Sequence, residues 1–391
     1  MPFLTDRIQD TQRRETQARA LADENTTDVS ALHRGTRGGF LKSRFAFDLD
    51  AIEEELRRSI IGQPRAIDEV MNVLRVVRAD IGDPRKPLAS LLFCGPTGVG
   101  KTETVRTLAR ILHGDADAMC RIDMNTLSQE HYAAALTGAP PGYVGSKEGT
   151  TILDQEKIEG SHSRPGIVLF DELEKASDEV ILALLNVLDN GILTVASGER
   201  TYSFRNTLIF MSSNLGAREL QALADRAAVG AAGMGQRMRR LMARAAMRGR
   251  DRRDAAREVV TSCLLKRFPP EFVNRIDHIE AFDWIDPEAM PRLVDVEISR
   301  LNRRLAKHGC LVEIDPEVSN FLAERGFDPR FGARGLRRAI RQHLEFPLAD
   351  HLLDLSAHAE PGAEEGDRRV LQARLNDQAL EFYQSRMEDN V

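Results

Sequence analysis

The 391-residue sequence lacks several patterns that define whole classes of protein. Its four cysteines lie far apart without paired spacing, which argues against a disulfide framework or a zinc site and suits buried thiols in a reducing cytoplasm. No apolar run approaches the length that crosses a bilayer, and the opening MPFLTDRIQDTQRRETQ lacks the apolar segment of a secretory signal. None of the nine histidines belongs to an HExxH pattern, so we expect no transition metal. The sequence therefore predicts a cytoplasmic protein with no membrane segment.

The overall charge and a further missing motif restrict the range of possible functions. The formal net charge of −6 is modest, so there is no general reason to expect nucleic acid or an anionic membrane as the main partner. The sequence has no GxSxG nucleophile elbow, which argues against an intrinsic protease. Hydrophobic residues make up 42% of a chain long enough for two or three domains, so most of it can bury a core.

Composition divides the chain into three parts. Residues 1–45 are rich in Gln, Arg, Thr and Asp and carry Gly-Gly at 38–39, which predicts a flexible N-terminal extension. A tail with no specific role is favoured there over an arm that contacts an adaptor or a ring. Residues 46–283 predict a large domain and residues 284–391 a smaller C-terminal domain.

Strand and helix patterns alternate in residues 46–283. Four apolar runs are typical of buried strands: Ser90–Cys94, Cys120–Met124, Ile167–Phe170 and Thr207–Met211. Apolar residues at helical spacing follow Lys101 and Ser177, and Gly114 and Gly191 end these two runs. The pattern predicts an α/β fold with a parallel sheet flanked by helices.

The C-terminal part is predicted to be mainly helical. Pro287 and Pro291 open a helix, whose apolar stripe runs through Val294, Ile298, Leu301 and Leu305. A second helix follows Arg334 and is expected to bend at Pro347, and strand-like pieces surround 370–375.

A phosphate-binding loop follows the first strand. The residues that fit GxxxxGK[ST] are Gly95, Pro96, Thr97, Gly98, Val99, Gly100, Lys101 and Thr102. Backbone N–H groups can wrap phosphates only where side chains are small or absent, and the next helix points its positive end at the same anion. We expect Lys101 to reach the β- and γ-phosphates of ATP and the Thr102 hydroxyl to hold Mg²⁺.

Two carboxylates follow the third strand. Asp171, at the strand's end, can bind Mg²⁺ directly or through water, and Glu172 can orient and deprotonate the attacking water. An Asp-Glu pair after an apolar run is by itself commonplace. Downstream of a phosphate-binding loop, it predicts a site that hydrolyses nucleotide.

With these motifs the chain resembles the Clp ATPases of the AAA+ class, most closely the second ATPase module of ClpB-type disaggregases and its relatives in ClpA and ClpV. The resemblance covers about residues 47–375. Its motifs are, in order, Ile60-Ile61-Gly62-Gln63, GPTGVGKT, GAPPGYVG at 138–145, LFDELEKA at 169–176, FRNTLIFMSSNLG at 204–216, FPPEFVNRID at 268–277 and FDPRFGARGLRRAI at 327–340. It implies a large AAA+ ATPase domain and a small Clp-type domain.

The resemblance also implies roles for residues outside the loop. Ile60 and Ile61 would pack on the adenine, and Asn214 would be a sensor that positions the water together with Glu172. By itself, Asn214 is better explained as a turn-capping amide. Arg275 resembles the arginine finger that enters a neighbouring subunit's site, and Arg334 resembles a second sensor that reports the nucleotide state to the small domain. For either arginine alone, a surface salt bridge would be the simpler interpretation.

Two segments point to protein substrates in a homo-hexameric ring. Tyr143 and Val144 lie between Gly142 and Gly145 and follow two prolines, so a loop tip is expected. The resemblance implies that a ring of such tyrosines grips an extended chain. Without that resemblance, a loop aromatic tucked into the core would be favoured. Gly191–Phe204 is typical of a hairpin, either beside the same pore or with no special role.

The chain also departs from the family. It is too short for a first ATPase ring or the middle domain of disaggregases, which puts ordinary disaggregation in doubt, and it lacks the tripeptide of protease-coupled members. The Arg-rich insertion 233–257 is interpreted first as a solvated, partly helical segment. A docking element for an acidic protein partner is the second hypothesis. Nucleic acid is disfavoured, because no aromatics interleave with the arginines.

Three functions follow from these observations. The leading one is an ATP-dependent unfoldase or remodelling chaperone that threads polypeptide through a hexameric ring. The alternatives are a nucleotide-switched assembly or regulatory scaffold, and the ATPase subunit of a compartmental protease.

Overall fold

The computed structural model describes residues 41–126, 152–194, 201–220, 222, 250–327, 332–358, 369–376 and 379–385. Three predicted features therefore lie largely or wholly outside the described residues: the extension 1–45 as far as residue 40, Tyr143 with Val144, and residues 233–249 of the Arg-rich insertion. Within the described part of the chain, no helix is both long and apolar enough to span a membrane.

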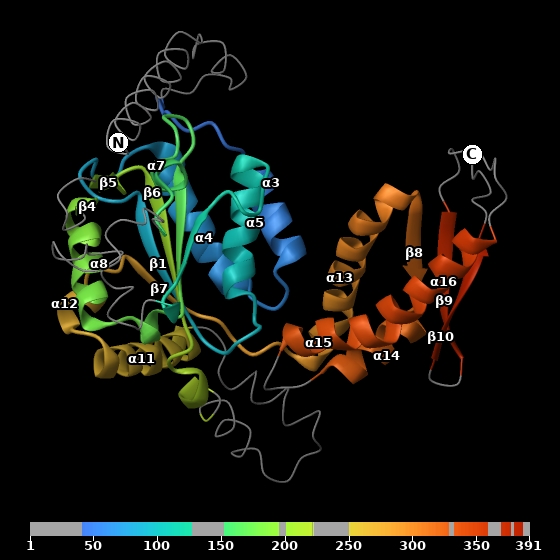
Figure 1. The fold of residues 1–391 in the computed structure, drawn as a ribbon. Coiled ribbons are helices and arrows are strands. Elements are labelled where there is room, and N and C mark those ends of the chain that lie inside the picture. Colours follow the sequence, from blue (N-terminus) through green and yellow to red (C-terminus); the bar gives the residue numbers. More distant parts are fainter. Residues whose placement is uncertain are drawn as a thin grey trace, which may run out of the picture.

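A five-stranded parallel sheet forms the centre of the large domain (Figure 1). Its strands lie in the order β2-β3-β6-β1-β7 and span Cys120–Asp123, Gly166–Asp171, Thr207–Ser213, Ala89–Cys94 and His278–Ala281. The α/β fold and the four predicted strands are confirmed. Strand β7 was not predicted, because its four half-buried residues include a histidine and a glutamate and show no apolar run.

Helices cover both faces of this sheet. Alternate residues of β1 face opposite sides, so Leu91 and Phe93 join one buried cluster while Leu92 and Cys94 join the other. Figure 1 shows α3, α4 and α5 on the side nearer the small domain, α8 and α12 on the far side, and α11 beneath the sheet. These helices span Leu49–Ser59, Pro64–Ala79, Lys101–His113, Asp178–Asn190, Arg250–Arg267 and Pro270–Val273.

Glycines end the two predicted helices. Gly114 and Gly191 both take left-handed backbone angles, with φ of 82° and 64°, immediately after α5 and α8. A residue without a Cβ adopts this conformation at little cost, which explains why both helices stop there.

Smaller elements complete the large domain. A short helix α7, Gln155–Glu159, precedes β3, and a 3-10 turn, Leu173–Lys175, follows it. The hairpin predicted within 191–204 is confirmed as antiparallel strands β4 (Ile192–Thr194) and β5 (Thr201–Ser203). Phe45, the last residue of the predicted extension, is buried, so the core takes in the end of that segment.

The C-terminal part is mainly helical, as predicted, with a small sheet at its far edge (Figure 1). Its helices are α13, α14, α15 and α16, which span Met290–Leu305, Pro316–Gly326, Ala333–Ile340 and Phe346–Ala357. Short 3-10 turns, Pro287–Ala289 and Ala306–His308, flank α13. The three-stranded sheet has the order β10-β9-β8, with bounds Ala379–Ser385, Arg369–Asn376 and Cys310–Ile314.

The predicted bend at Pro347 takes a different form. A π-helical segment, Arg341–Glu345, joins α15 to α16, and Pro347 lies in the first turn of α16. Proline is tolerated there because the first N–H groups of a helix have no partner within it.

Candidate nucleotide site

The phosphate-binding loop joins the carboxyl end of β1 to the first residue of α5. Gly95, Gly98 and Gly100 all have positive φ, at 140°, 74° and 108°. A Cβ on Gly95 would lie 2.5 Å from the carbonyl oxygen of Phe282, so the loop closes only against a residue without a side chain. Gly100 caps α5, whose first turn begins with Lys101 and Thr102.

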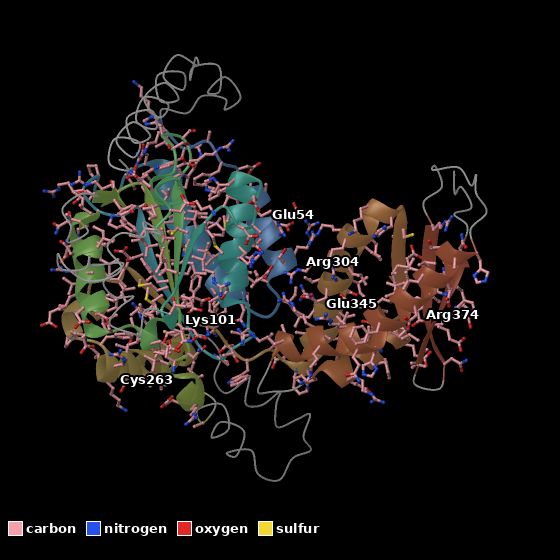
Figure 2. All side chains as sticks on the ribbon, viewed as in Figure 1. Glu54, Lys101, Cys263, Arg304, Glu345 and Arg374 are labelled. Atoms are coloured by element: carbon pink, nitrogen blue, oxygen red, sulfur yellow. The ribbon has the colours of Figure 1, made fainter. Side chains whose placement is uncertain are left out.

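Lys101 is the buried centre of this loop (Figure 2). Its Nζ donates to the carbonyl oxygens of Gly95 at 2.5 Å and Pro96 at 2.9 Å, and to Oδ1 of Asn214 at 3.0 Å. Burial lowers the pKa of the ammonium to about 8. An anion at the mouth of the loop would favour the charged form.

Asp171 ends β3 with its carboxylate almost fully buried. One oxygen, Oδ1, accepts a hydrogen bond from the hydroxyl of Ser212 on the adjacent strand β6. The other, Oδ2, lies 2.6 Å from NH2 of Arg121 on β2. Residues of the two strands beside β3 therefore hold the predicted metal ligand from both sides.

Glu172 stands in a strained backbone conformation. Its φ of 58° and ψ of 49° are left-handed, which costs a residue with a side chain about 1–3 kcal/mol. Its N–H donates to Oγ of Ser212 at 3.2 Å. Ser212 thus contacts both acidic residues, and the sharp turn directs the Glu172 side chain out of the strand and into the pocket.

Asn214 follows β6 directly, as predicted. Its side-chain oxygen accepts from Lys101, and its backbone N–H donates to the Glu174 carboxylate at 3.2 Å. Glu174 also accepts from the Ser213 hydroxyl at 2.8 Å. The segment after β3 and the end of β6 are therefore locked together beside the lysine.

A pocket of about 620 Å³ lies between the two domains and is lined by the phosphate-binding loop and the residues around it. The predicted residues that line it are Ile60, Ile61, Thr97, Gly98, Val99, Gly100, Lys101, Thr102, Asp171, Glu172, Asn214 and Arg334. Gly95 and Pro96 of the loop do not line the pocket, but their carbonyl oxygens accept hydrogen bonds from Lys101.

The small domain closes one side of this pocket. The N–H of Ala333, at the start of α15, donates to the carbonyl oxygen of Gly98 at 3.0 Å. Arg300 of α13 pairs with Glu103 of α5 and, at 2.7 Å, with Glu297. Glu103 directly follows Thr102, so this ion-pair network joins the small domain to the first turn after the phosphate-binding loop.

Arg275 lies apart from the other predicted site residues. Its side chain is half exposed, and its Nε lies 2.6 Å from Oδ1 of Asp189 at the end of α8. It does not line the pocket that contains Lys101. The structure thus brings together every predicted site residue that it describes, except this arginine.

Several residues at the site were not predicted. Ser212, Glu174 and Arg121 contact predicted residues, and Glu103 pairs with Arg300 of the small domain. Gln63 binds the interdomain linker through reciprocal hydrogen bonds with the backbone of Asp283 at 2.8 and 3.0 Å. The sequence did contain a signal for Ser212 and Glu174, since both lie in motifs that carry the family resemblance. Their partners became evident only once neighbouring strands were paired.

The residues present fit MgATP. Positive-φ glycines leave a backbone cradle, the Lys101 ammonium lies at its floor, and Thr102 and Asp171 are the oxygen donors that Mg²⁺ prefers. A bound Mg²⁺ would neutralise charge on the terminal phosphates. Fold and site together define a P-loop ATPase of the AAA+ class.

Comparison with known families identifies the chain more closely. Residues 86–279 match the family described as AAA domain (Cdc48 subfamily), and residues 285–363 match the C-terminal, D2-small domain of ClpB protein. The chain belongs to the Clp family of AAA+ ATPases.

Individual relatives agree. A Pseudomonas aeruginosa protein called ATP-dependent protease ATP-binding subunit-like protein AmiB is 55% identical over 98% of this chain and 99% of its own. The ClpB chaperone of Rhizobium meliloti is 40% identical over 77% of this chain, but only 32% of its own length is matched. The S. cerevisiae Hsp104:casein complex superposes with a TM-score of 0.66 at 28% identity, covering 86% of this chain and 52% of that one.

Proposed function

We propose that the chain is an ATP-driven protein unfoldase or remodelling chaperone that works as a homo-hexameric ring. The observation that supports this most directly is the separation of Arg275 from the pocket that gathers the other site residues. A phosphate-binding site whose finger lies elsewhere on the same chain needs a second subunit to complete it.

Each residue has a defined task in this proposal. Lys101 and the loop backbone bind the ATP phosphates, Thr102 and Asp171 hold Mg²⁺, and Glu172 activates water. Ile60 and Ile61 contact the adenine, Asn214 positions the water with Glu172, and Arg334 senses nucleotide from the small domain. Arg275 enters the neighbouring subunit's pocket, where its planar guanidinium neutralises charge on the γ-phosphate.

Protein is the proposed substrate, gripped by Tyr143 and Val144. The fold neighbour Hsp104 was solved in complex with casein, and we expect this chain to work in the cytoplasm. The Arg-rich insertion is proposed to dock an acidic protein partner. Removing residues 233–249 while leaving α11 intact should abolish that docking without loss of ATP hydrolysis.

The first experiment separates hydrolysis from substrate work. Tyr143→Ala should hydrolyse ATP at nearly the parent rate but fail to unfold a tagged fluorescent protein. Glu172→Gln should bind ATP, stop hydrolysis and retain substrates during purification. Normal unfolding by Tyr143→Ala would refute threading, and full biological function of Glu172→Gln would favour the nucleotide-switched scaffold.

A second candidate function rests on the relatives' names. Two proteins that match most of this chain are called ATP-dependent protease ATP-binding subunit-like. Under this alternative, the ring feeds a separate compartmental protease. Co-purification of a peptidase with the ATP-bound Glu172→Gln ring, and degradation of the fluorescent substrate in the wild-type mixture, would support it.

A further inference from the structure

Arg121 makes an ion pair with the predicted metal ligand. It lies on the edge strand β2, whose residues alternate between buried and exposed, so Arg121 and Asp123 share the exposed face. Both line the nucleotide pocket together with Lys101 and Thr102. From there, NH2 of Arg121 reaches Oδ2 of Asp171 at 2.6 Å.

The two partners differ in their surroundings. The Asp171 side chain is 11% exposed and that of Arg121 48% exposed. A nearly buried carboxylate needs an opposite charge or hydrogen-bond donors, and here Ser212 satisfies one oxygen and Arg121 the other. The guanidinium can swing into the open pocket, whereas the carboxylate is held by strand β3.

The carboxylate that would hold Mg²⁺ is thus already paired with a guanidinium. Mg²⁺ and a guanidinium repel each other, and the single negative charge of Asp171 cannot neutralise both cations. Other pocket arginines pair with different acids, since Arg106 contacts Asp117 and Arg110 contacts Glu55. Competition for the metal ligand is therefore specific to Arg121 among these three.

We propose that Arg121 is a positioning residue that competes with Mg²⁺ for Asp171 and turns toward the nucleotide phosphates when the metal takes the carboxylate. This deepens the proposed function and rests on it. The exchange makes metal binding depend on nucleotide, because the phosphates provide a second anion for the displaced guanidinium. It also keeps Asp171 paired between turnovers.

Metal-dependent nucleotide binding tests the exchange without relying on turnover. The full chain carrying Glu172→Gln, which blocks hydrolysis, is titrated with a fluorescent ribose-labelled ATP analogue and then with Mg²⁺. Adding Arg121→Gln should lower the half-saturating Mg²⁺ concentration by about three- to tenfold. This is the effect expected when one partly exposed competing charge is removed. Metal-free binding of the analogue should also weaken, because without Arg121 the unpaired Asp171 carboxylate repels the phosphates in the same pocket.

Two further variants separate exchange from general electrostatics. Arg106→Gln removes the same charge from the same pocket without touching Asp171, so the Mg²⁺ midpoint should move less than twofold. Arg121→Lys keeps the charge and should retain metal-free binding. Melting curves without nucleotide confirm that each variant is folded.

The outcomes are distinguishable. An unchanged or raised Mg²⁺ midpoint in Arg121→Gln, or an equal shift in Arg106→Gln, overturns the exchange while leaving the proposed function intact. If the Glu172→Gln chain binds no nucleotide at all, the proposed function fails and the exchange fails with it.

Discussion

Arg275 and Asp189 form an ion pair within one subunit, with Nε 2.6 Å from Oδ1. The pair ties the segment that follows α12 to the last turn of α8. The Asp189 side chain is three-quarters buried while half of the Arg275 side chain is exposed, so the carboxylate anchors the base of a guanidinium that faces outward. In the proposed ring, this geometry would present Arg275 to the neighbouring subunit.

The first prediction concerns mixed rings. Arg275→Ala and Lys101→Ala should each lose ATP hydrolysis by at least about a hundredfold, since an arginine finger contributes about 10³–10⁵ in comparable sites. Mixing the two purified variants should restore part of the activity. In a mixed ring, an Arg275→Ala subunit has an intact pocket, and a neighbouring Lys101→Ala subunit can supply Arg275 to it. Steady-state ATPase rates over a range of mixing ratios measure this. A mixture no more active than its components would show that Arg275 does not act between subunits.

The second prediction concerns Ser212, which holds Asp171 and Glu172 together. Ser212→Ala removes both hydrogen bonds and should lower kcat by about tenfold or more, equivalent to about 1–3 kcal/mol for an unsatisfied buried group, while the KM for ATP changes little. Ser212→Thr keeps the hydroxyl and should restore most of the rate. The buried Ser319 of α14 provides the control, since Ser319→Ala should affect melting alone. Equal kcat values for the Ala and wild-type proteins would contradict this role.

The third prediction compares two glycines. Gly332 and Gly309 both have positive φ, at 51° and 63°. A Cβ on Gly332 would lie 2.9 Å from the carbonyl oxygen of Gly98, whereas nothing lies within 4 Å of one on Gly309. Gly309→Ala should lose about 1–2 kcal/mol of stability from left-handed backbone strain. Gly332→Ala should lose more, because its φ of 51° with ψ of −135° is a conformation that only glycine adopts readily. Gly332→Ala alone should also weaken ATP binding, because it pushes α15 off the phosphate-binding loop. Equal ATP affinities in calorimetry would argue against that contact.

The fourth prediction is a pH dependence of stability. Burial, together with the nearby Glu69 carboxylate, raises the pKa of Glu280 to about 7. In the unfolded chain the pKa is near 4.5, so between these values the folded state binds more protons, and stability falls as pH rises from about 4.5 to 7. Above pH 7 the full cost of the buried charge is present.

Glu280→Gln removes that cost. It should raise the free energy of unfolding by about 1–2 kcal/mol at pH 8, a value discounted for partial exposure, and by almost nothing at pH 4.5. Urea unfolding at the two pH values measures the difference. The exposed Glu271→Gln serves as control and should show no such change. A pH-independent effect of Glu280→Gln would indicate altered packing instead.

Much of the site could be predicted because its chemistry requires contiguous residues. A phosphate-binding loop needs its glycines, Lys101 and Thr102 in one turn, and Asp171 with Glu172 must end a buried strand, so local pattern was sufficient. The fifth strand β7 escaped prediction for the opposite reason. At the sheet edge it is half-buried, and the apolar run by which a central strand is recognised is missing there.

Residue pairs such as Arg121 with Asp171, or Glu103 with Arg300, could not be predicted. Their members are 50 and 197 positions apart, and each arginine by itself looks like any surface charge. Only the parallel pairing of β2 with β3 and the docking of α13 against α5 bring them together.

Local sequence patterns were sufficient to predict the nucleotide site, the central strands and the family resemblance, because glycine spacing and apolar periodicity act over a few residues. The tertiary structure alone decided the strand order, the cross-strand support of the two acidic residues by Ser212, and the placement of Arg275 outside its own pocket. These depend on contacts between distant segments, whose geometry is set when the sheet assembles and the two domains pack.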